Sequence, residues 1–279
     1  MADRLGRGSV MGGTSVADYQ QAEAALLALA DPAKAEFLAG FFKTGRGQYG
    51  EGDRFLGITV PALRRLARQF AQLSLPHCKR LLNSPYNETR VLALAILVNR
   101  YRKGDTAAKE SIYQFYLKNR RRINNWNLVD GSAPYIVGAH LIGRDRSFLY
   151  ELARSSSLWD RRIAVVATLA FIREGSVTDT LKLSELLLAD EHDLMHKACG
   201  WMLREVGKRN ELELENFLRQ HQALMPRTML RYAIERFPPM KRKAYLAGTM
   251  ERCLEGSLAA GRPVAVVRPW PDEGGKRLD

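Results

Sequence analysis

The 279-residue sequence predicts an all-α protein built from repeated pairs of helices. Apolar residues recur every three or four positions along nearly the whole chain, and the alternating pattern typical of strands is absent. Polar turns that lead into long amphipathic stretches begin at positions 87, 124, 158, 192 and 227, at spacings of 37, 34, 34 and 35 residues. A two-helix unit of this length indicates an α-solenoid rather than a plain helical bundle. The TPR residue pattern is missing, so we expect HEAT-like repeats with a concave basic face.

Capping residues predict where the individual helices begin and end. Asp31 followed by Pro32 supplies an N-cap and a first-turn proline before the stretch AKAEFLAGFFK. Further starts are expected after Asn87, Asp105, Ser157 and Asp190. Ends are expected at Gly104, Gly143, Gly175 and Gly207. Shorter helical stretches, such as SFLYELARS and LKLSELLLA, lie between the long ones and complete the helix pairs.

The predicted repeat domain covers residues 17–250. Residues 1–16 have no apolar segment of the secretory kind and are interpreted as a disordered N-terminal tail or an expression remnant. Residues 251–279 lose the helical period and predict a flexible C-terminal tail. No stretch approaches the roughly 18 consecutive apolar residues of a membrane span. We therefore expect no membrane partner, and a monomer is the default.

Charge and cysteine content narrow the class of partner. The net charge is +13, of which +12 falls within residues 17–250. A basic folded surface suits a polyanion such as nucleic acid, and ordinary solubility is the alternative. Cys78, Cys199 and Cys253 lie far apart and form no C-x-x-C pair. This argues against a disulfide framework or a Cys-rich zinc site and favours a reducing cytosol.

Two motifs are rejected as ligand sites. GRGQYG, from Gly45 to Gly50, matches G-x-G-x-x-G, but a helix and not a strand is predicted before it. It is interpreted as a glycine-rich loop between helices, in which Arg46 is available to bind a phosphate. His192 and His196 are spaced like zinc ligands on one helix face, yet no third ligand is evident. Surface or capping roles are favoured for both histidines.

Equivalent positions of the repeats predict a basic stripe. Four cations recur at spacings of 72, 35 and 34 residues: Arg90, Arg162, Lys197 and Arg231. In a solenoid such positions line one face. Arg204 shares a helix face with Lys197, and Trp201 lies between them. Cations interleaved with a tryptophan can bind phosphates and stack on bases, and the alternative is solvated charge around a core tryptophan.

The unit that begins at position 124 departs from this stripe. It has Asn127 where a cation is expected, and Trp126 and Asp130 lie one turn apart on the same face. Pro134 lacks the N–H that would bond the Asp130 carbonyl, so a kink or break is expected there. A carboxylate beside an indole among cations indicates a site, and the cations are expected to lower the pKa of Asp130. The alternative is that Asp130 caps a helix or pairs with Arg162.

Four segments together resemble the AlkD family of DNA alkylation-repair glycosylases, which are HEAT-like solenoids. They occur in the family's order and spacing: YGEGDRFLGITVP (49–61), NNWNLVD (124–130), LWDRR (158–162) and KACGWMLREVGK (197–208). The similarity extends over about residues 20–246. It implies hydrolytic excision of N3- and N7-alkylated purines from double-stranded DNA, without extrusion of the base and without a cofactor or metal. It also implies a cytoplasmic location, in the bacterial cytosol or nucleoid.

The resemblance further implies roles for individual residues. Asp130 matches the catalytic aspartate, and Trp126 and Trp201 match the two tryptophans beside the lesion. Arg162 matches the active-site arginine of a W-x-x-R pattern. Phe41 stands where an aromatic residue lines the cleft.

Two functions remain open from the sequence. One is a monofunctional alkylpurine DNA glycosylase, and the other is a non-catalytic HEAT-like scaffold that binds DNA structures or a protein partner. The basic stripe, together with Arg204 and Arg46, would bind the DNA backbone in either case. The presence of Asp130 favours the enzyme, because a scaffold has no need of a carboxylate among cations.

Overall fold

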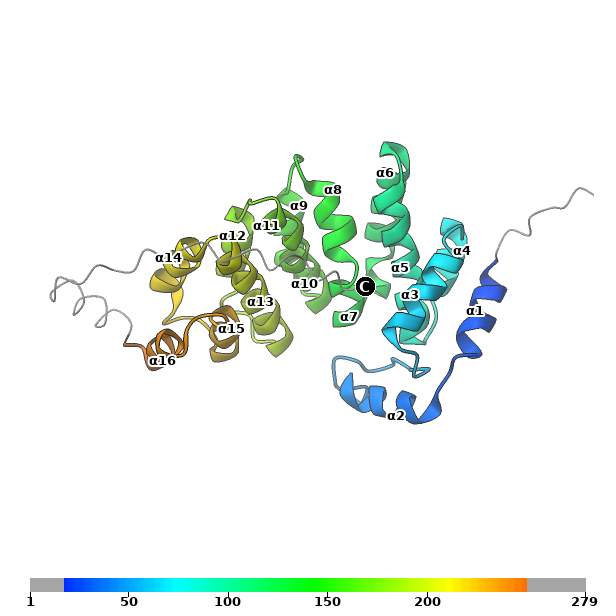
Figure 1. Ribbon diagram of the computed structural model, residues 1–279, viewed down its shortest axis with the longest axis horizontal. Helices are drawn as coiled ribbons and strands as arrows, with labels where there is room; N and C mark the ends of the chain where they lie inside the picture. Colours follow the sequence, from blue (N-terminus) through cyan, green and yellow to red (C-terminus); the bar gives the residue numbers. More distant parts are fainter. Residues whose placement is uncertain (1–17, 250–279) are drawn as a thin grey trace, which may run out of the picture.

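Two layers of helices follow a curved path from one end of the molecule to the other (Figure 1). The computed structural model describes residues 18–249, and the tails predicted at 1–16 and 251–279 lie outside this span. Within the described span the chain is helical, and its one bridge between extended segments joins Arg54 and Tyr86. The predicted all-α solenoid is confirmed.

The inner layer consists of one helix, or one run of shorter helical segments, from each repeat, packed against the next along the array. Its members are α3 (Val60–Gln69), α5 (Asn87–Lys103), α7 (Trp126–Asp130), a π-helix (Pro134–Gly138), α8 (Ala139–Leu141), α10 (Leu158–Ala167), α11 (Leu169–Arg173), α13 (Asp193–Arg209) and α15 (Arg227–Ala233). The outer layer comprises α1 (Tyr19–Leu27), α4 (Leu75–Leu82), α6 (Thr106–Asn119), α9 (Ser147–Ala153), α12 (Thr178–Leu186) and α14 (Glu211–His221). The remaining helices are α2 (Pro32–Phe41), α16 (Pro239–Ala247) and a 3₁₀ turn (Arg120–Arg122).

Most helix boundaries lie where the capping residues predict them. The side chains of Asp31, Asp105 and Ser157 accept hydrogen bonds from backbone N–H groups in the first turns of α2, α6 and α10. Glycines follow the ends of α5, α8 and α11: Gly104, Gly143 and Gly175. At Gly175 the backbone has a φ of 82°, which a residue with a Cβ rarely adopts.

Two predicted starts are displaced by one or two residues. Asn87 is the first residue of α5 and not its cap, because its side-chain amide donates to Asp53 instead of capping the helix. Helix α13 begins at Asp193 rather than directly after Asp190. The Asp190 carboxylate binds Arg161 at 2.6 Å and accepts the N–H of His192 at 2.9 Å, and His192 is the residue that caps the helix.

Gly207 does not end a helix, contrary to the sequence prediction. It lies inside α13, which continues to Arg209. A Cβ at this position would lie 2.5 Å from Cδ2 of Leu214 on α14. The glycine therefore permits the close approach of two packed helices, a role that local sequence does not distinguish from a helix end.

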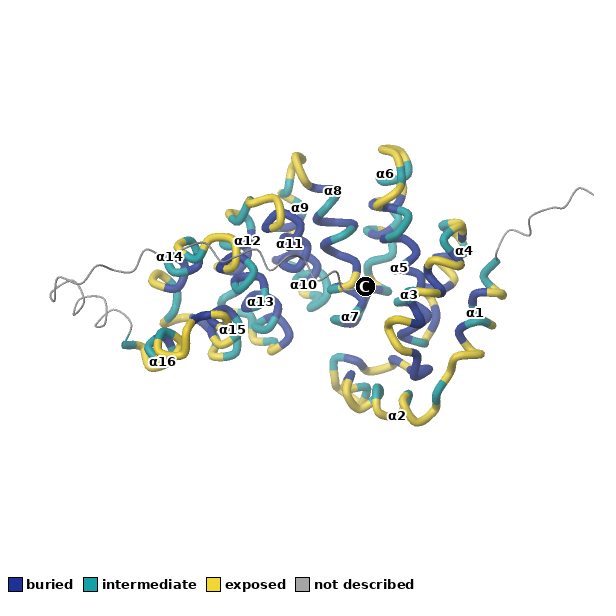
Figure 2. Tube along the Cα trace, in the orientation of Figure 1, coloured by how far each residue is buried: buried dark blue, intermediate teal, exposed yellow. Residues whose placement is uncertain are grey.

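The hydrophobic core runs between the two layers along the array, as the buried segments in Figure 2 show. Cys78 and Cys199 are free thiols within it, and burial raises their pKa values to about 11 and about 12. Cys253 lies outside the described residues. None of the helices described is long and apolar enough to cross a membrane.

The inner layer is interrupted at the repeat that departs from the basic stripe. Helix α7 ends at Asp130 and the chain resumes as a π-helix at Pro134, so the predicted break is confirmed. The π-helix packs closely on the neighbouring repeat: a Cβ at Gly138 would lie 2.1 Å from the carbonyl oxygen of Ala167. The interruption leaves Asp130 at a helix end within the inner layer.

Gly138→Ala is expected to destabilise the fold by about 1–3 kcal/mol, the usual cost of overpacking. The added methyl group would collide with backbone rather than with a flexible side chain. Gly40→Ala in α2 is the control, because nothing lies within 4 Å of its added Cβ and alanine is favoured in helices. Urea unfolding measures both variants, and equal free energies of unfolding would contradict the packing argument.

Candidate functional site

The candidate site is built around α7. Trp126 begins this helix and Asp130 ends it, so the two side chains lie one turn apart. The Asn125 side chain caps the helix by accepting the Trp126 N–H at 2.8 Å. The indole lies parallel to the Phe42 ring, with centroids 4.9 Å apart, and meets Phe41 edge to face at 6.1 Å. Trp126 is thereby fixed against the end of α2, while Phe41 remains 56% exposed.

Asp130 is held by Arg162 of α10. Arg162 Nε donates to Oδ1 at 2.9 Å, and Nη2 donates to Oδ2 at 2.8 Å. The arginine side chain is 5% exposed and the aspartate side chain 20% exposed. The ion pair that the sequence offered as an alternative therefore exists. Its two parallel hydrogen bonds fix the carboxylate plane and leave part of the carboxylate open to solvent.

The pKa of Asp130 is raised, which corrects the expectation drawn from the sequence. Burial of the carboxyl raises its pKa more than the Arg162 guanidinium lowers it. The sequence shows the neighbouring cation but not the loss of water around the carboxylate. Because both oxygens accept N–H bonds from a cation, the geometry is that of the ionised form.

Arg162 also connects three consecutive repeats of the inner layer. It belongs to α10, binds Asp130 of α7, and donates through Nη1 to the Leu194 carbonyl in the first turn of α13. With its guanidinium directed at protein groups, Arg162 is 4% exposed. The prediction that it lines an exposed basic stripe is wrong, and its observed contacts position Asp130.

Arg90 is a second buried arginine with an aspartate partner. It is 2% exposed and pairs with Asp53, which precedes α3. Its guanidinium also donates to the Asn124 side chain. The prediction that Arg90 lies on an exposed DNA-binding stripe is therefore wrong. Repeat-equivalent arginines at 90 and 162 each turn toward a carboxylate from an earlier segment, so equivalence in sequence did not mean exposure.

Buried polar contacts hold the chain between α2 and α3 against α5. The Glu88 carboxylate accepts backbone N–H groups at 2.8 to 3.3 Å from Leu56, Gly57 and Ile58. Asp53 accepts the side-chain amides of Asn87 at 3.0 Å and Asn125 at 2.8 Å. Sequence reasoning missed these residues, and the one signal was the polar run NETR, whose four side chains are all buried.

The glycine-rich segment 45–50 is a loop between α2 and α3, so the rejection of a dinucleotide-binding turn is confirmed. Arg46 is exposed in this loop. The ring of Tyr49 meets Trp159 of α10 edge to face at 6.3 Å. The loop therefore reaches from α2 to the turn of α10 that precedes Arg162, which the sequence did not reveal.

Helix α13 carries three of the predicted site residues: Lys197, Trp201 and Arg204. Lys197 pairs with Asp193 at 2.7 Å, and this hydrogen bond raises the pKa of Lys197. Trp201 is half-buried and donates through Nε1 to Glu205 at 3.2 Å. Arg204 also binds Glu205, at 3.7 Å. The two predicted site cations of this helix, Lys197 and Arg204, are therefore partly neutralised by neighbouring carboxylates.

The remaining predicted residues lie away from Asp130 or act as caps. Arg231 is exposed on α15, which is separated from α10 by α11 and α13 in the inner layer. His192 caps α13 by accepting the Leu194 N–H at 3.1 Å, and the His196 ring bonds the Asp190 carbonyl. The capping role expected for His192 is confirmed.

These contacts define a helical-repeat protein whose inner layer holds an arginine-bound carboxylate beside a tryptophan. The sequence profile of a family described as DNA alkylation repair enzyme matches residues 22–237, and the chain belongs to that family. Its role is therefore in DNA alkylation repair, with DNA as its partner.

A solved structure described as a predicted DNA alkylation repair enzyme from Enterococcus faecalis has the same fold. The two chains are 15% identical with a TM-score of 0.58, over 75% of this chain and 97% of the other. No curated protein matches the chain.

Asp53→Ala is expected to lower the free energy of unfolding by about 3–5 kcal/mol, because it leaves the Arg90 guanidinium buried without its partner. Asp193→Ala is the control: it breaks an ion pair whose side chains are 57% and 40% exposed, which costs less than about 1 kcal/mol. Urea denaturation measures both. Similar decreases in the free energy of unfolding of the two variants would show that burial does not determine how much stability is lost when the Asp53–Arg90 ion pair is broken.

Proposed function

We propose that this protein is a monofunctional DNA glycosylase that hydrolyses the N-glycosidic bond of cationic N3- and N7-alkylated purines in duplex DNA. The observation that carries the proposal is the Asp130 carboxylate. Both of its oxygens accept hydrogen bonds from Arg162, as an ionised carboxylate does. Its side chain is one-fifth exposed, and it lies one turn from Trp126. Family membership supplies the substrate class, which is alkylated DNA.

The chemistry of the lesion matches a lone carboxylate. Alkylation at N3 or N7 places a positive charge on the purine and makes the base a good leaving group. Cleavage of the bond between C1′ and the purine nitrogen builds positive charge on the sugar, and an ionised Asp130 stabilises that charge. Water then adds to C1′, and the carboxylate orients it and accepts its proton. The products are the free alkylated base and an abasic sugar.

Aromatic side chains contact the cationic nucleotide in this proposal. Trp126 and Phe41 form an aromatic wall beside Asp130, and Trp201 lies on the inner helix that Arg162 connects to the site. A cation over an indole face is stabilised by about 0.5–2 kcal/mol. Because these residues recognise charge, we propose that the base stays in the duplex and that neutral bases are poor substrates.

Asp130→Asn is expected to lower the rate of base release from alkylated duplex DNA by about 10²- to 10³-fold, since it removes the charge that stabilises the transition state. The assay measures 7-methylguanine and 3-methyladenine set free. Asp179→Asn is the matched control, because Asp179 also binds an arginine, Arg146, with similar exposure, but lies on the outer helix α12.

The two possible failures of this experiment have different meanings. No release above background by the wild-type protein would leave the non-catalytic scaffold as the function. Equal release by the Asp130→Asn variant would retain the glycosylase and remove Asp130 from its role.

The rate of base release is expected to fall on acidification at a pH above the ordinary aspartate value of about 3.9. The reason is that the raised pKa of Asp130 leads to protonation earlier as the pH falls, and only the ionised form stabilises the sugar cation. Arg162→Ala removes the group that lowers this pKa, so the acid limb of kcat/KM moves to higher pH. Arg161→Ala, which breaks the neighbouring pair with Asp190, is the control. If Arg162→Ala left the acid limb of kcat/KM at the same pH, Arg162 would not be controlling the pKa of Asp130.

A further inference from the structure

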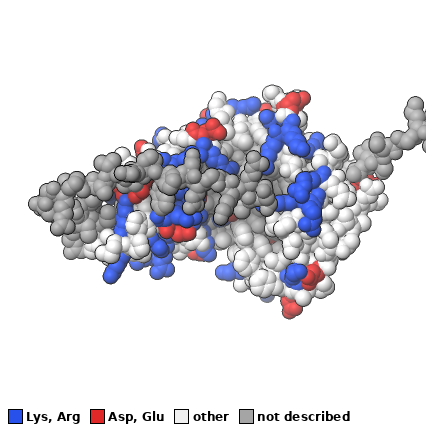
Figure 3. All heavy atoms as spheres, in the orientation of Figure 1, with Lys and Arg blue, Asp and Glu red and all other residues white. Residues whose placement is uncertain are grey.

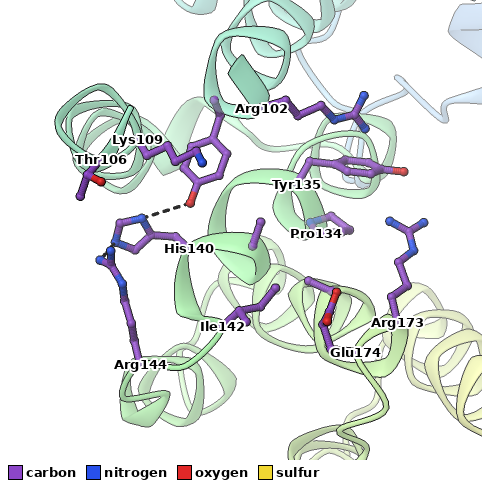
Figure 4. A pocket seen from close by; sticks show the side chains of 13 residues that line it. Arg102, Thr106, Lys109, Pro134, Tyr135, His140, Ile142, Arg144, Arg173 and Glu174 are labelled. Atoms are coloured by element: carbon purple, nitrogen blue, oxygen red, sulfur yellow. Dashed lines mark hydrogen bonds between the residues drawn. The ribbon is translucent and has the colours of Figure 1, made fainter. Parts of the chain in front are cut away.

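The inner layer has a second cationic group, at the C-terminal ends of α5 and α11. Arg102 lies at the C-terminal end of α5 and Arg173 at the end of α11. Between them lies Tyr135 of the π-helix, with the two guanidinium carbons 4.7 and 5.4 Å from its ring centroid (Figure 4). We call these three residues the Tyr135 cluster.

The Tyr135 cluster borders an open pocket of about 520 Å³. The pocket is lined by two further cations, Lys109 and Arg144, and by one carboxylate, Glu174. Arg144 is occupied by Glu110 at 3.4 Å. On the face seen in Figure 3, Lys and Arg side chains gather over the region of α3 to α6, which includes this end of α5.

The predicted DNA-binding cations and the cations of the Tyr135 cluster differ in whether they are paired with carboxylates. Four of the cations predicted to bind DNA are paired with carboxylates: Arg90, Arg162, Lys197 and Arg204. In the cluster, Arg102 and Arg173 have no carboxylate within ion-pair distance among residues 18–249, and both are exposed. The Tyr135 cluster therefore carries two exposed cations that are free to meet a phosphate.

The separation of the two ends of α5 fits the width of a duplex. Arg102 follows Arg90 by twelve residues, which in a helix is roughly 18 Å. The half-buried positions between them on α5 are Val91, Ala95, Asn99 and Arg100, and the Arg100 guanidinium donates to the Leu73 carbonyl of the loop before α4. DNA grooves are about 6 and 12 Å wide, and the phosphates on either side add to these widths. A duplex whose lesion-bearing strand lies over Asp130 therefore brings its other backbone to the Tyr135 cluster.

We infer that the Tyr135 cluster binds backbone phosphates of the strand complementary to the one that carries the lesion. The inference rests on the proposed function, because Asp130 defines where the lesion-bearing strand lies. Arg102 and Arg173 supply N–H donors in a geometry that suits phosphate oxygens. Their contacts with Tyr135 hold the two guanidinium groups in place before DNA arrives, which lowers the entropy lost on binding.

The first test is the salt dependence of binding to a duplex, measured by fluorescence anisotropy. The double variant Arg102→Ala and Arg173→Ala is expected to bind more weakly and to lower the slope of log K against log salt by about two. The control removes two exposed cations from the outer layer, Lys79→Ala on α4 and Lys182→Ala on α12, and keeps the wild-type slope. Equal slopes in the two double variants would overturn the inference.

The second test assigns the strand. One strand carries a 7-methylguanine nucleotide that a 2′-fluoro group protects from hydrolysis, and uncharged methylphosphonates replace phosphates in either strand. With the complementary strand uncharged, wild type and the Arg102→Ala, Arg173→Ala variant are expected to bind equally. With the lesion-bearing strand uncharged, their difference is expected to persist.

A reversed or symmetric result in the second test would overturn the strand assignment. Failure of the proposed function is distinguishable, because it appears as absence of base release by the wild-type protein. That absence would leave the slopes of the first test unchanged. Wild-type melting temperatures in both double variants are the check on folding.

Discussion

The guanidinium of Arg162 is the contact on which the site depends. In a solenoid each repeat touches only its neighbours, so a group formed by three repeats needs a side chain that bonds in both directions. Arg162 does so, with Asp130 on one side and the Leu194 carbonyl on the other. Buried ion pairs contribute little net stability in general, since desolvation offsets their attraction. The value of this one lies in the fixed position and plane of a carboxylate that still meets solvent.

Much of the fold could be predicted from sequence because its causes are local. The repeat period, the caps at Asp31, Asp105 and Ser157, and the break at Pro134 all act over a few residues. Gly207 shows the limit: a glycine required by a neighbouring helix has the same local appearance as one that ends a helix. Tertiary packing decided between the two.

The residues of the candidate site could be proposed from the sequence, but their burial and their pKa values could not. Asp130 and Trp126 stood out because they broke a repeating pattern, and the helix geometry that puts them together is local. The burial of Arg90 depends on Asp53, a partner more than thirty positions away in the chain, and the pKa of Asp130 is raised by burial, which only the folded chain defines. Net charge is a sum over residues, whereas the charge available to a ligand depends on pairing, which only the folded chain defines.

Helix α2, which carries Phe41, is packed less tightly than the inner layer that carries Asp130. This helix buries none of its residues, whereas the segment that follows it is held by the Glu88 and Asp53 carboxylates and by the stacking of Phe42 on Trp126. Asp130 and Arg162, by contrast, belong to the closely packed inner layer. Phe41, at the end of α2, therefore belongs to a less tightly packed region than Trp126 and Asp130 of α7, and regions with few buried contacts open at a lower free energy than the core. Amide exchange would be faster in α2 than in the inner layer, so one side of the candidate site can move while the Asp130 carboxylate keeps its position.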